Sequence, residues 1–385
     1  MRAVSLGFTL RRLMTGIAAS CSLAMTSLPA AADIVVGQVA PLSGVLATTG
    51  AQMVLGVKIA FDGANDRGGI NGQKIKHVVL DDGYKLEETI KLTQQLIDQH
   101  KPAALIGFAG TLNVGELLKR GVLEKAGIAL VGPYTGGENL RNPFNPWIFH
   151  IRAGYVDETA KMVDHLATLG IKRIAVFHQD DAFGKSGLVG VETAAAKFGS
   201  EVVAKGTYDR LKPDVTNAVK TIAAAKPQAV VMVSVNKPTA AFVEAYRKAG
   251  GAGMLINISV VDPQELVKLA GIDNMRGVGI TQTVPYPYTG VSPIVKDFHE
   301  HFKKYAPKDT TMSYTVFEEF IAAKVLIEAL KRAGKDPTPD RVMQAMVSLG
   351  RYDVGGFTVD FSRDNRLGSR FVDIVVIGAN GQLLK

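Results

Sequence analysis

The stretch from Ile34 to Asp82 constrains the fold more than any other part of the chain. An apolar, β-branched run begins at Ile34 and breaks at Pro41-Leu42-Ser43-Gly44, and apolar residues then recur at helical spacing as far as Ala64. Paired glycines follow, and a second apolar run ends the stretch. This order predicts a strand, a helix and a parallel strand. In an open parallel sheet, ligands bind at the carboxyl ends of the strands, where the next helix begins.

The same alternation continues along the rest of the chain. Apolar runs predict strands at 103–106, 128–131, 173–177, 202–208, 229–233, 254–258 and 371–377. Amphipathic segments predict helices at 86–97, 114–125, 215–225, 239–249, 294–305 and 315–333, with further helices beginning near 157 and ending near 198. Long alternation of this kind is typical of parallel sheets covered by helices on both faces. The predicted fold class is therefore α/β, with doubly wound parallel sheets.

Three extended segments divide this alternation into two lobes. The first crossing is expected at 147–152, the second at 278–288 and the third near 352–358. The prolines of the second segment exclude a central strand there. We therefore expect one lobe to comprise 33–150 plus 287–351, and the other to comprise 151–286 plus 352–385. Three connections indicate a hinge rather than a flexible tether.

Two short motifs repeat at nearly the same spacing. Lys101-Pro102 recurs as Lys226-Pro227, and Lys125-Ala126-Gly127 recurs as Lys248-Ala249-Gly250. Either match alone would be chance, because Lys-Pro and Ala-Gly mark many junctions between helices and strands. Two matches at almost one offset favour duplicated lobes.

The first 32 residues differ from the remainder. Arginines at 2, 11 and 12 precede an apolar stretch at 13–28, and Ala30-Ala31-Ala32 fits a signal peptidase site. We expect residues 1–32 to be a cleaved export signal and the protein to be periplasmic. Cys21 sits in a weak lipobox-like context, so a lipoprotein form stays an alternative to the soluble one. The apolar run is too short for a membrane anchor, and no later segment is expected to cross a bilayer.

Composition excludes several other classes of function. The net charge of +8 is spread along the chain without a basic run, so nucleic-acid binding is not indicated. Cys21 is the single cysteine, which leaves no disulfide after cleavage of the signal. The histidines are scattered, and neither a metal site nor a cofactor is predicted. Gly184-Lys185-Ser186 is similar to the end of a phosphate-binding loop, but Gln179 stands where that motif needs glycine.

Several motifs together resemble a known family, the type I periplasmic substrate-binding proteins of ABC transporters. The resemblance is to the branch that binds leucine, isoleucine, valine and amides. Its residues are Gly37, Pro41-Leu42-Ser43-Gly44, Gly50, Gly56, Asn65, Gly68-Gly69-Ile70-Asn71-Gly72, Asp81-Asp82, Gly132-Pro133, Thr135, Asp181, Phe183-Gly184 and the segment Tyr314–Gly334. The resemblance implies a monomer that closes a hinge over a small-molecule solute and is then recognised by an ABC permease in the inner membrane.

The resemblance also implies which residues bind the solute. In the first lobe, loop hydroxyls and amides would hold a carboxylate, and a second loop would form a wall of the cleft. The carboxylate loops map onto Thr111, Leu112, Asn113, Tyr134, Thr135 and Gly136, and the wall onto Ser43, Gly44 and Thr49. The second lobe would contribute Phe183, Ser234, Asn236 and Ser259.

One loop departs from the pattern of the family. Amino-acid binders of this branch place an acidic side chain there to pair with the ammonium of the solute, but this chain has Ser259-Val260-Val261, with Asp262 further along. A buried ammonium without a carboxylate is costly. The solute class therefore stays open between amino acids, amides, and aromatic or aliphatic acids. A ligand sensor with a signalling partner is the alternative function, and an α/β enzyme is a weaker one.

Overall fold

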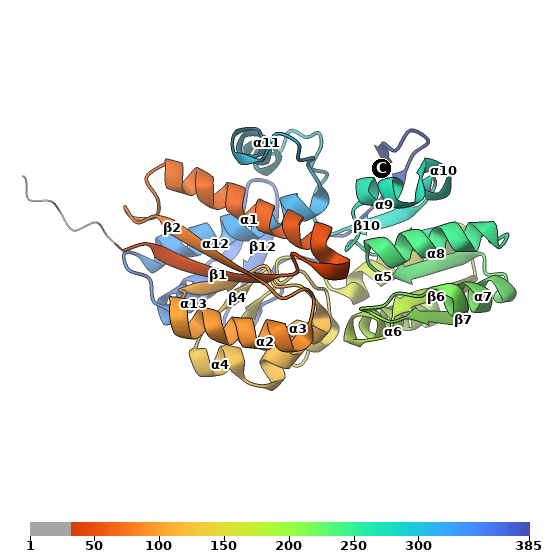
Figure 1. The fold of residues 1–385 in the computed structure, drawn as a ribbon, viewed down its shortest axis with the longest axis horizontal. Coiled ribbons are helices and arrows are strands. Elements are labelled where there is room, and N and C mark those ends of the chain that lie inside the picture. Colours follow the sequence, from red (N-terminus) through yellow and green to blue (C-terminus); the bar gives the residue numbers. More distant parts are fainter. Residues whose placement is uncertain (1–31) are drawn as a thin grey trace, which may run out of the picture. The chain divides into compact units, whose positions relative to one another are not determined.

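The computed structural model describes residues 32–385, so the expected export signal lies outside the described residues except for Ala32. The described chain contains a five-stranded sheet, a seven-stranded sheet and a two-stranded sheet. We call the five-stranded sheet with the helices packed on it the first lobe, and the seven-stranded sheet with its helices the second lobe (Figure 1). The predicted α/β class is confirmed.

All neighbouring strands in the first lobe are parallel, in the order β2-β1-β3-β4-β5. Val36 of β1 pairs with His77 on one side and with Ala104 on the other, so β1 is an internal strand. The strands are β1 (Ile34–Ala40), β2 (Ile75–Asp81), β3 (Ala104–Ile106), β4 (Leu130–Val131) and β5 (Ile148–Phe149). The helices of this lobe are α1 (Ala47–Asp66), α2 (Leu86–Gln95), α3 (Thr111–Lys119), α4 (Val122–Ala126), α11 (Pro293–Tyr305), α12 (Tyr314–Ala333) and α13 (Pro339–Ser348), with short turns at Gly44–Leu46, Leu96–His100 and Glu138–Leu140.

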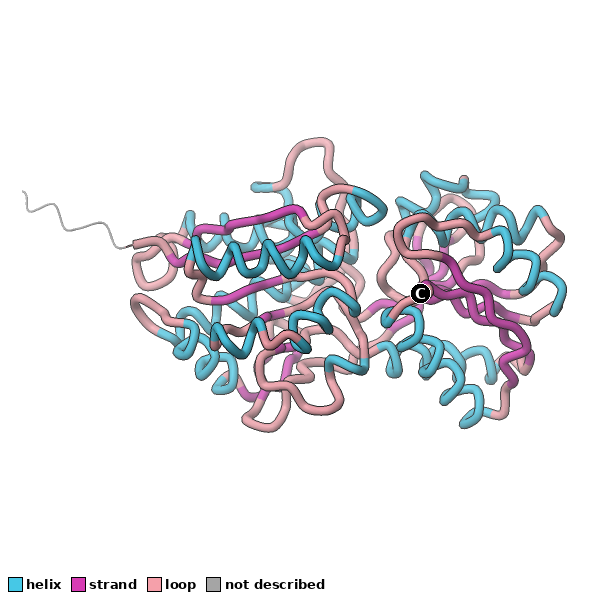
Figure 2. The backbone as a smooth tube through the Cα atoms, turned by 60° about the horizontal axis from the view of Figure 1, so that its bottom comes forward, coloured by secondary structure: helices cyan, strands magenta, loops and turns pink. Residues whose placement is uncertain are grey.

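The second lobe has the strand order β14-β13-β10-β9-β8-β6-β7, and only the pairs that involve β13 are antiparallel. Figure 2 shows helices packed along the strands of each lobe. The strands are β6 (Arg173–Gln179), β7 (Glu201–Tyr208), β8 (Ala229–Val233), β9 (Met254–Asn257), β10 (Gly279–Gln282), β13 (Asp373–Ile377) and β14 (Leu383–Leu384). The helices are α5 (Tyr155–Thr168), α6 (Ala182–Phe198), α7 (Thr216–Ala225), α8 (Asn236–Lys248), α9 (Pro263–Ala270) and α10 (Ile272–Met275).

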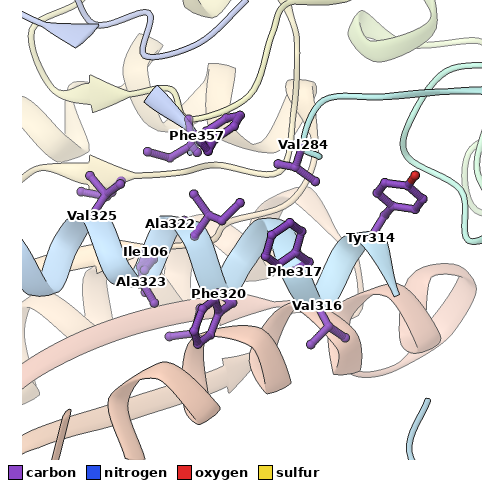
Figure 3. Packing of buried hydrophobic residues seen from close by; sticks show 14 of the residues in the cluster. Ile106, Val284, Tyr314, Val316, Phe317, Phe320, Ala322, Ala323, Val325 and Phe357 are labelled. Atoms are coloured by element: carbon purple, nitrogen blue, oxygen red, sulfur yellow. The ribbon is translucent and has the colours of Figure 1, made fainter. Parts of the chain in front are cut away.

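Helix α12 lies in the core of the first lobe and is buried along most of its length. Figure 3 shows Val316, Phe317 and Phe320 projecting from it into the surrounding apolar side chains. Helix α1 crosses it closely at Gly56, where a Cβ atom would lie 2.3 Å from the carbonyl oxygen of Val316. Among the described residues, Gly44–Asp66 is long and apolar enough to span a membrane, contrary to the sequence-based expectation. Its packing against α12 explains that apolar character as core burial.

The two repeated motifs adopt matching backbone conformations. Lys101 and Lys226 both have left-handed dihedral angles, with φ of 46° and 45°, immediately before their prolines. Gly127 and Gly250 also have positive φ, at 60° and 79°. A non-glycine residue with positive φ is uncommon. The shared backbone conformation of the two lysines is therefore a more specific similarity between the lobes than their sequence identity alone.

Two predicted elements differ from the structure for local reasons. The helix expected at 114–125 is divided into α3 and α4, because Gly121 takes a left-handed conformation with φ of 66°. The segment 278–288 does enter the sheet, since β10 lies between β9 and β13. The exclusion of a central strand there was wrong for Gly279–Gln282, because the prolines begin only at Pro285, beyond the end of β10.

Contacts beyond residue 352 favour a later position for the third crossing. A two-stranded sheet of β11 (Gly350–Asp353) and β12 (Thr358–Phe361) comes before it. The ring of Phe361 packs edge-on against Phe149 of the first lobe at 5.3 Å, and Gly368 donates a backbone hydrogen bond to His150. We therefore propose that the chain leaves the first lobe after residue 368 rather than at 352–358. The other lobe boundaries stay predictions.

Candidate functional site

A small cavity lies between loops of the two lobes, at the carboxyl ends of their strands. The first lobe contributes residues from four segments that precede or begin helices, and the second lobe contributes four more residues. The lining residues are Leu46, Thr49, Tyr84, Ala109, Gly110 and Tyr134 from the first lobe, and Tyr155, Phe183, Val235 and Val260 from the second. The cavity measures about 20 Å³, little more than the space for one water molecule. A larger solute therefore needs the lining residues to move apart.

Two helices begin at this cavity without a side chain that caps them. Gly110 and Val235 are the N-cap residues of α3 and α8, and neither side chain accepts a hydrogen bond from the first turn. Helix α1 instead continues from the turn Gly44–Leu46, and the amide of Ala47 donates to the carbonyl of Gly44. By contrast, α6 and α9 are capped by the carboxylates of Asp181 and Asp262. Uncapped amides at a helix start attract an anion or another hydrogen-bond acceptor. The cavity is thus electrostatically suited to a negative or carbonyl-bearing group.

Aromatic rings form much of the cavity wall. Tyr155 and Phe183 pack edge-on, with their centroids 5.4 Å apart. Tyr84 accepts a hydrogen bond of 3.2 Å from Gln179, and the hydroxyl of Tyr134 is 3.0 Å from that of Thr315. Burial raises the pKa of the tyrosines at 84, 134 and 155, so all three are neutral phenols near pH 7. These rings suit a solute with an apolar body.

The carboxylates that lie closest in sequence to the cavity-lining residues already have other hydrogen-bond partners. Asp181 accepts hydrogen bonds from the amides of Phe183 and Gly184, and Asp262 accepts one from the amide of Glu265. Glu158 accepts from the amide of Ser259 at 2.8 Å. Among the described residues, no acidic or basic side chain lines the cavity. An ammonium group bound there would therefore lack a carboxylate partner.

Arg152 connects the cavity to the first crossing between the lobes. It is fully buried, and its guanidinium lies 3.5 Å from Glu318 and 3.7 Å from Glu158. Burial alone would lower the pKa of Arg152, but these two carboxylates reverse the effect and raise it. The guanidinium carbon also lies 4.8 Å from the ring centroid of Tyr134, and Arg152 donates to the hydroxyl of Ser259. The buried, permanently charged guanidinium of Arg152 thus holds Tyr134, which lines the cavity, beside the loop of the other lobe that contains Ser259.

Three of the predicted site residues line the cavity, namely Thr49, Tyr134 and Phe183. Asn236 lies beside it and donates to the hydroxyl of Thr49 at 3.4 Å. Asn236 also accepts a hydrogen bond of 2.8 Å from the amide of Asp262. These contacts join the first helix of one lobe to two loops of the other.

The remaining predicted residues do not line the cavity. In the first lobe, the hydroxyls of Thr111 and Thr135 bond to each other at 2.6 Å, and Asn113 donates to Thr89 at 2.7 Å. Leu112 is partly buried, and the carbonyl of Gly136 accepts a bond from the amide of Tyr155. In the second lobe, the hydroxyl of Ser234 lies 2.6 Å from that of Thr239, and the hydroxyl of Ser259 donates to Glu158. Ser43 and Gly44 are exposed.

The cavity-lining residues that the sequence analysis missed are neighbours of those it named. Gly110 and Val235 each lie one position before a predicted residue, and Val260 lies one position after another. Tyr84 lies two positions after the acidic pair Asp81-Asp82 at the exit of β2, and its φ is 63°. Its position just after a strand was the sequence feature that could have identified Tyr84 as a site residue. The other missed residues are Leu46, Ala109 and Tyr155.

Comparison with known proteins places this arrangement in a family. The sequence model of the periplasmic binding protein family matches residues 33–382. The chain belongs to this family. Periplasmic binding proteins bind substrates. Among the described residues, no group of three or more histidine, cysteine or acidic side chains is placed to hold a metal ion.

Individual members of the family are similar over most of the chain. The "Leu/Ile/Val-binding protein homolog 8" of Brucella suis is 25% identical over 377 residues, which cover 93% of this chain and 91% of that protein. An "Amino acid binding protein" of Pseudomonas aeruginosa is 26% identical over 247 residues, 63% of this chain and 64% of its own length. A crystal structure of a substrate-binding periplasmic protein from Ralstonia solanacearum has 39% identity and a TM-score of 0.88, covering 91% of this chain and 99% of that one. The type I periplasmic-binding-protein fold predicted from the sequence is therefore confirmed.

Proposed function

We propose that this periplasmic binding protein is the exported solute receptor of an ABC importer. A solute enters between the lobes, the hinge closes, and the closed form presents its surface to a permease. The family match and the relatives named as leucine, isoleucine and valine binders support a transport role. The expected export signal supports a periplasmic location. We also propose that the protein is a monomer and that its partner is an ABC permease in the inner membrane.

We further propose that the solute is a small carboxylate with an apolar body and without an α-ammonium group. One observation carries this proposal: the uncapped starts of α3 and α8 meet aromatic and aliphatic side chains in a cavity lined by no carboxylate of the described chain. The helix starts would hold the carboxylate of the solute. Val235 and Val260 would contact its apolar body, and an ammonium placed there would lose its hydration without gaining an ion pair.

Matched pairs of solutes test this proposal. Thermal unfolding of the purified protein would be followed with valine and 3-methylbutanoate, with leucine and 4-methylpentanoate, and with phenylalanine and 3-phenylpropanoate. A solute at 100 times its dissociation constant stabilises the folded state by about 2.7 kcal/mol. We expect at least one acid without an amino group to raise the unfolding temperature and its amino-acid partner to leave it unchanged. Tight binding of an amino acid, with no response to its partner, would contradict the proposed solute class.

A further inference from the structure

The side chain of Arg210 extends from the second lobe to the first. It is not one of the residues that line the cavity. It lies in the loop between β7 and α7. The carboxylate of Asp209 accepts hydrogen bonds from the amides of Leu211 at 2.9 Å and Lys212 at 2.8 Å, which fixes this turn. The side chain of Arg210 is only 12% exposed. The loop thus holds a largely buried cation at the boundary between the lobes.

The guanidinium of Arg210 makes its closest contacts with the opposite lobe. It donates to the carbonyl oxygen of Tyr84 at 2.9 Å and to the side-chain oxygen of Asn113 at 2.8 Å. Its central carbon lies 4.1 Å from the ring centroid of Tyr84, in cation–π contact. On its own lobe, its nearest anion is Asp181, at 3.8 Å. These hydrogen bonds require the two lobes to be together, whereas the longer contact with Asp181 does not.

Tyr84 connects these contacts to the cavity. Its ring lines the cavity, and its backbone carbonyl is held by Arg210. The hydroxyl of Tyr84 accepts a hydrogen bond from Gln179, so the second lobe contacts this residue at both ends. A Cβ atom on Gly110 would lie 2.7 Å from the Tyr84 ring, so the ring also packs on the start of α3. Displacement of Arg210 would therefore release one wall of the cavity.

We propose that Arg210 is a clasp that holds the lobes together over the solute and sets the rate at which the solute leaves. This inference rests on the proposed solute-receptor function, because it assumes that the lobes open and close. In the open form, Arg210, the Tyr84 carbonyl and Asn113 are hydrated separately. Closure exchanges that hydration for charge-assisted hydrogen bonds, which are stronger than neutral ones. Arg210 is a positioning residue, because it acts on the cavity through Tyr84.

Loss of the clasp changes the balance between open and closed forms. Net contributions of hydrogen bonds to a charged group correspond to a factor of roughly ten or more in an equilibrium constant. We expect Arg210→Ala to lower the equilibrium constant for closure about tenfold, and the closed population by the same factor because the open form predominates without a solute. Both hydrogen bonds come from one terminal nitrogen of Arg210. Arg210→Lys keeps the charge but lacks the planar guanidinium that stacks on the ring of Tyr84, so part of the effect should remain.

The closed population can be measured without any solute. Thr48 and Glu265 lie on opposite lobes with their side-chain oxygens 3.4 Å apart. In a chain carrying Cys21→Ser, the pair Thr48→Cys and Glu265→Cys would be cross-linked with bismaleimidoethane, and the rate recorded. Arg120→Ala is the matched control, because Arg120 forms two hydrogen bonds to Glu87 within the first lobe. Reaction with a single maleimide would confirm equal thiol reactivity in every variant.

We expect cross-linking about tenfold slower in Arg210→Ala and unchanged in Arg120→Ala. In stopped-flow experiments with whichever acid of the matched panel binds most tightly, release should be about tenfold faster and association nearly unchanged. Equal cross-linking rates for Arg210→Ala and the unsubstituted background, or no cross-linking in that background, would overturn the clasp. Because cross-linking uses no solute, it can fail while the solute panel succeeds, and the two proposals remain distinguishable.

Discussion

Replacement of Phe183 by alanine should weaken solute binding far more than it weakens the fold. Phe183 is 3% exposed and lines the cavity at the start of α6. Burial of a phenylalanine side chain contributes about 1.5–3 kcal/mol. Its edge-on contact with Tyr155 joins residues of the same lobe and persists when the lobes part. The part specific to the closed form is therefore smaller, on the order of 1–2 kcal/mol, which raises the dissociation constant about 5- to 30-fold.

Phe198 provides the control, because it ends the same helix, is partly buried and does not line the cavity. Phe198→Ala should reduce the free energy of unfolding in urea while leaving the dissociation constant within twofold. Isothermal titration of both variants with the tightest-binding acid of the matched panel makes the comparison. If Phe183→Ala bound that acid as tightly as the unsubstituted protein, the assignment of this cavity as the solute site would be refuted.

Three other substitutions test separate parts of the account. Gly56→Ala should lower the free energy of unfolding in urea by about 2 kcal/mol or more, because its Cβ would lie 2.3 Å from a carbonyl oxygen of α12; unchanged stability would refute the close crossing. Burial alone would raise the pKa of Asp297, but hydrogen bonds from His301 and Lys324 lower it to about 2. The resulting stabilisation is about 1 kcal/mol after allowance for partial exposure; it is present above pH 4 and lost as the pH falls towards 2. The loss of unfolding free energy caused by Asp297→Asn, measured in urea, should therefore be smaller at pH 3 than at pH 7. Val260→Glu adds a carboxylate to the cavity and should reverse the matched panel, with valine bound at least tenfold more tightly than 3-methylbutanoate; an unchanged preference would contradict the role of the missing acid.

Local patterns were sufficient to predict most of the fold. The apolar run at Ile34 and the helical spacing that follows it correspond to β1 and α1, because burial on both faces of a parallel sheet leaves a continuous signature. The strand β10 was missed because its position depends on β13, an antiparallel partner about a hundred residues further along the chain. The later position that we propose for the third crossing depends on contacts such as that of Phe361 with Phe149, which join segments distant in sequence.

The cavity lies at the strand ends that the sequence indicated, but only Thr49, Tyr134 and Phe183 of the residues named from the sequence line it. Val235 lines the cavity, while its neighbour Ser234 bonds to Thr239 inside the second lobe. In the next loop, Val260 lines the cavity and Ser259 bonds to Glu158. Which of two adjacent residues faces the cavity depends on how each loop joins its helix. Sequence alone does not specify that rotation, and it gives no sign that Arg210 contacts the other lobe.

Small-angle X-ray scattering with and without the tightest-binding acid of the matched panel tests the central claim most directly. The proposal is that a hinge closes the two lobes over a carboxylate bound at the uncapped starts of α3 and α8. It predicts a smaller radius of gyration on saturation with that acid, and no change with the corresponding amino acid. An identical scattering curve with and without a bound acid would contradict closure as the function of this chain.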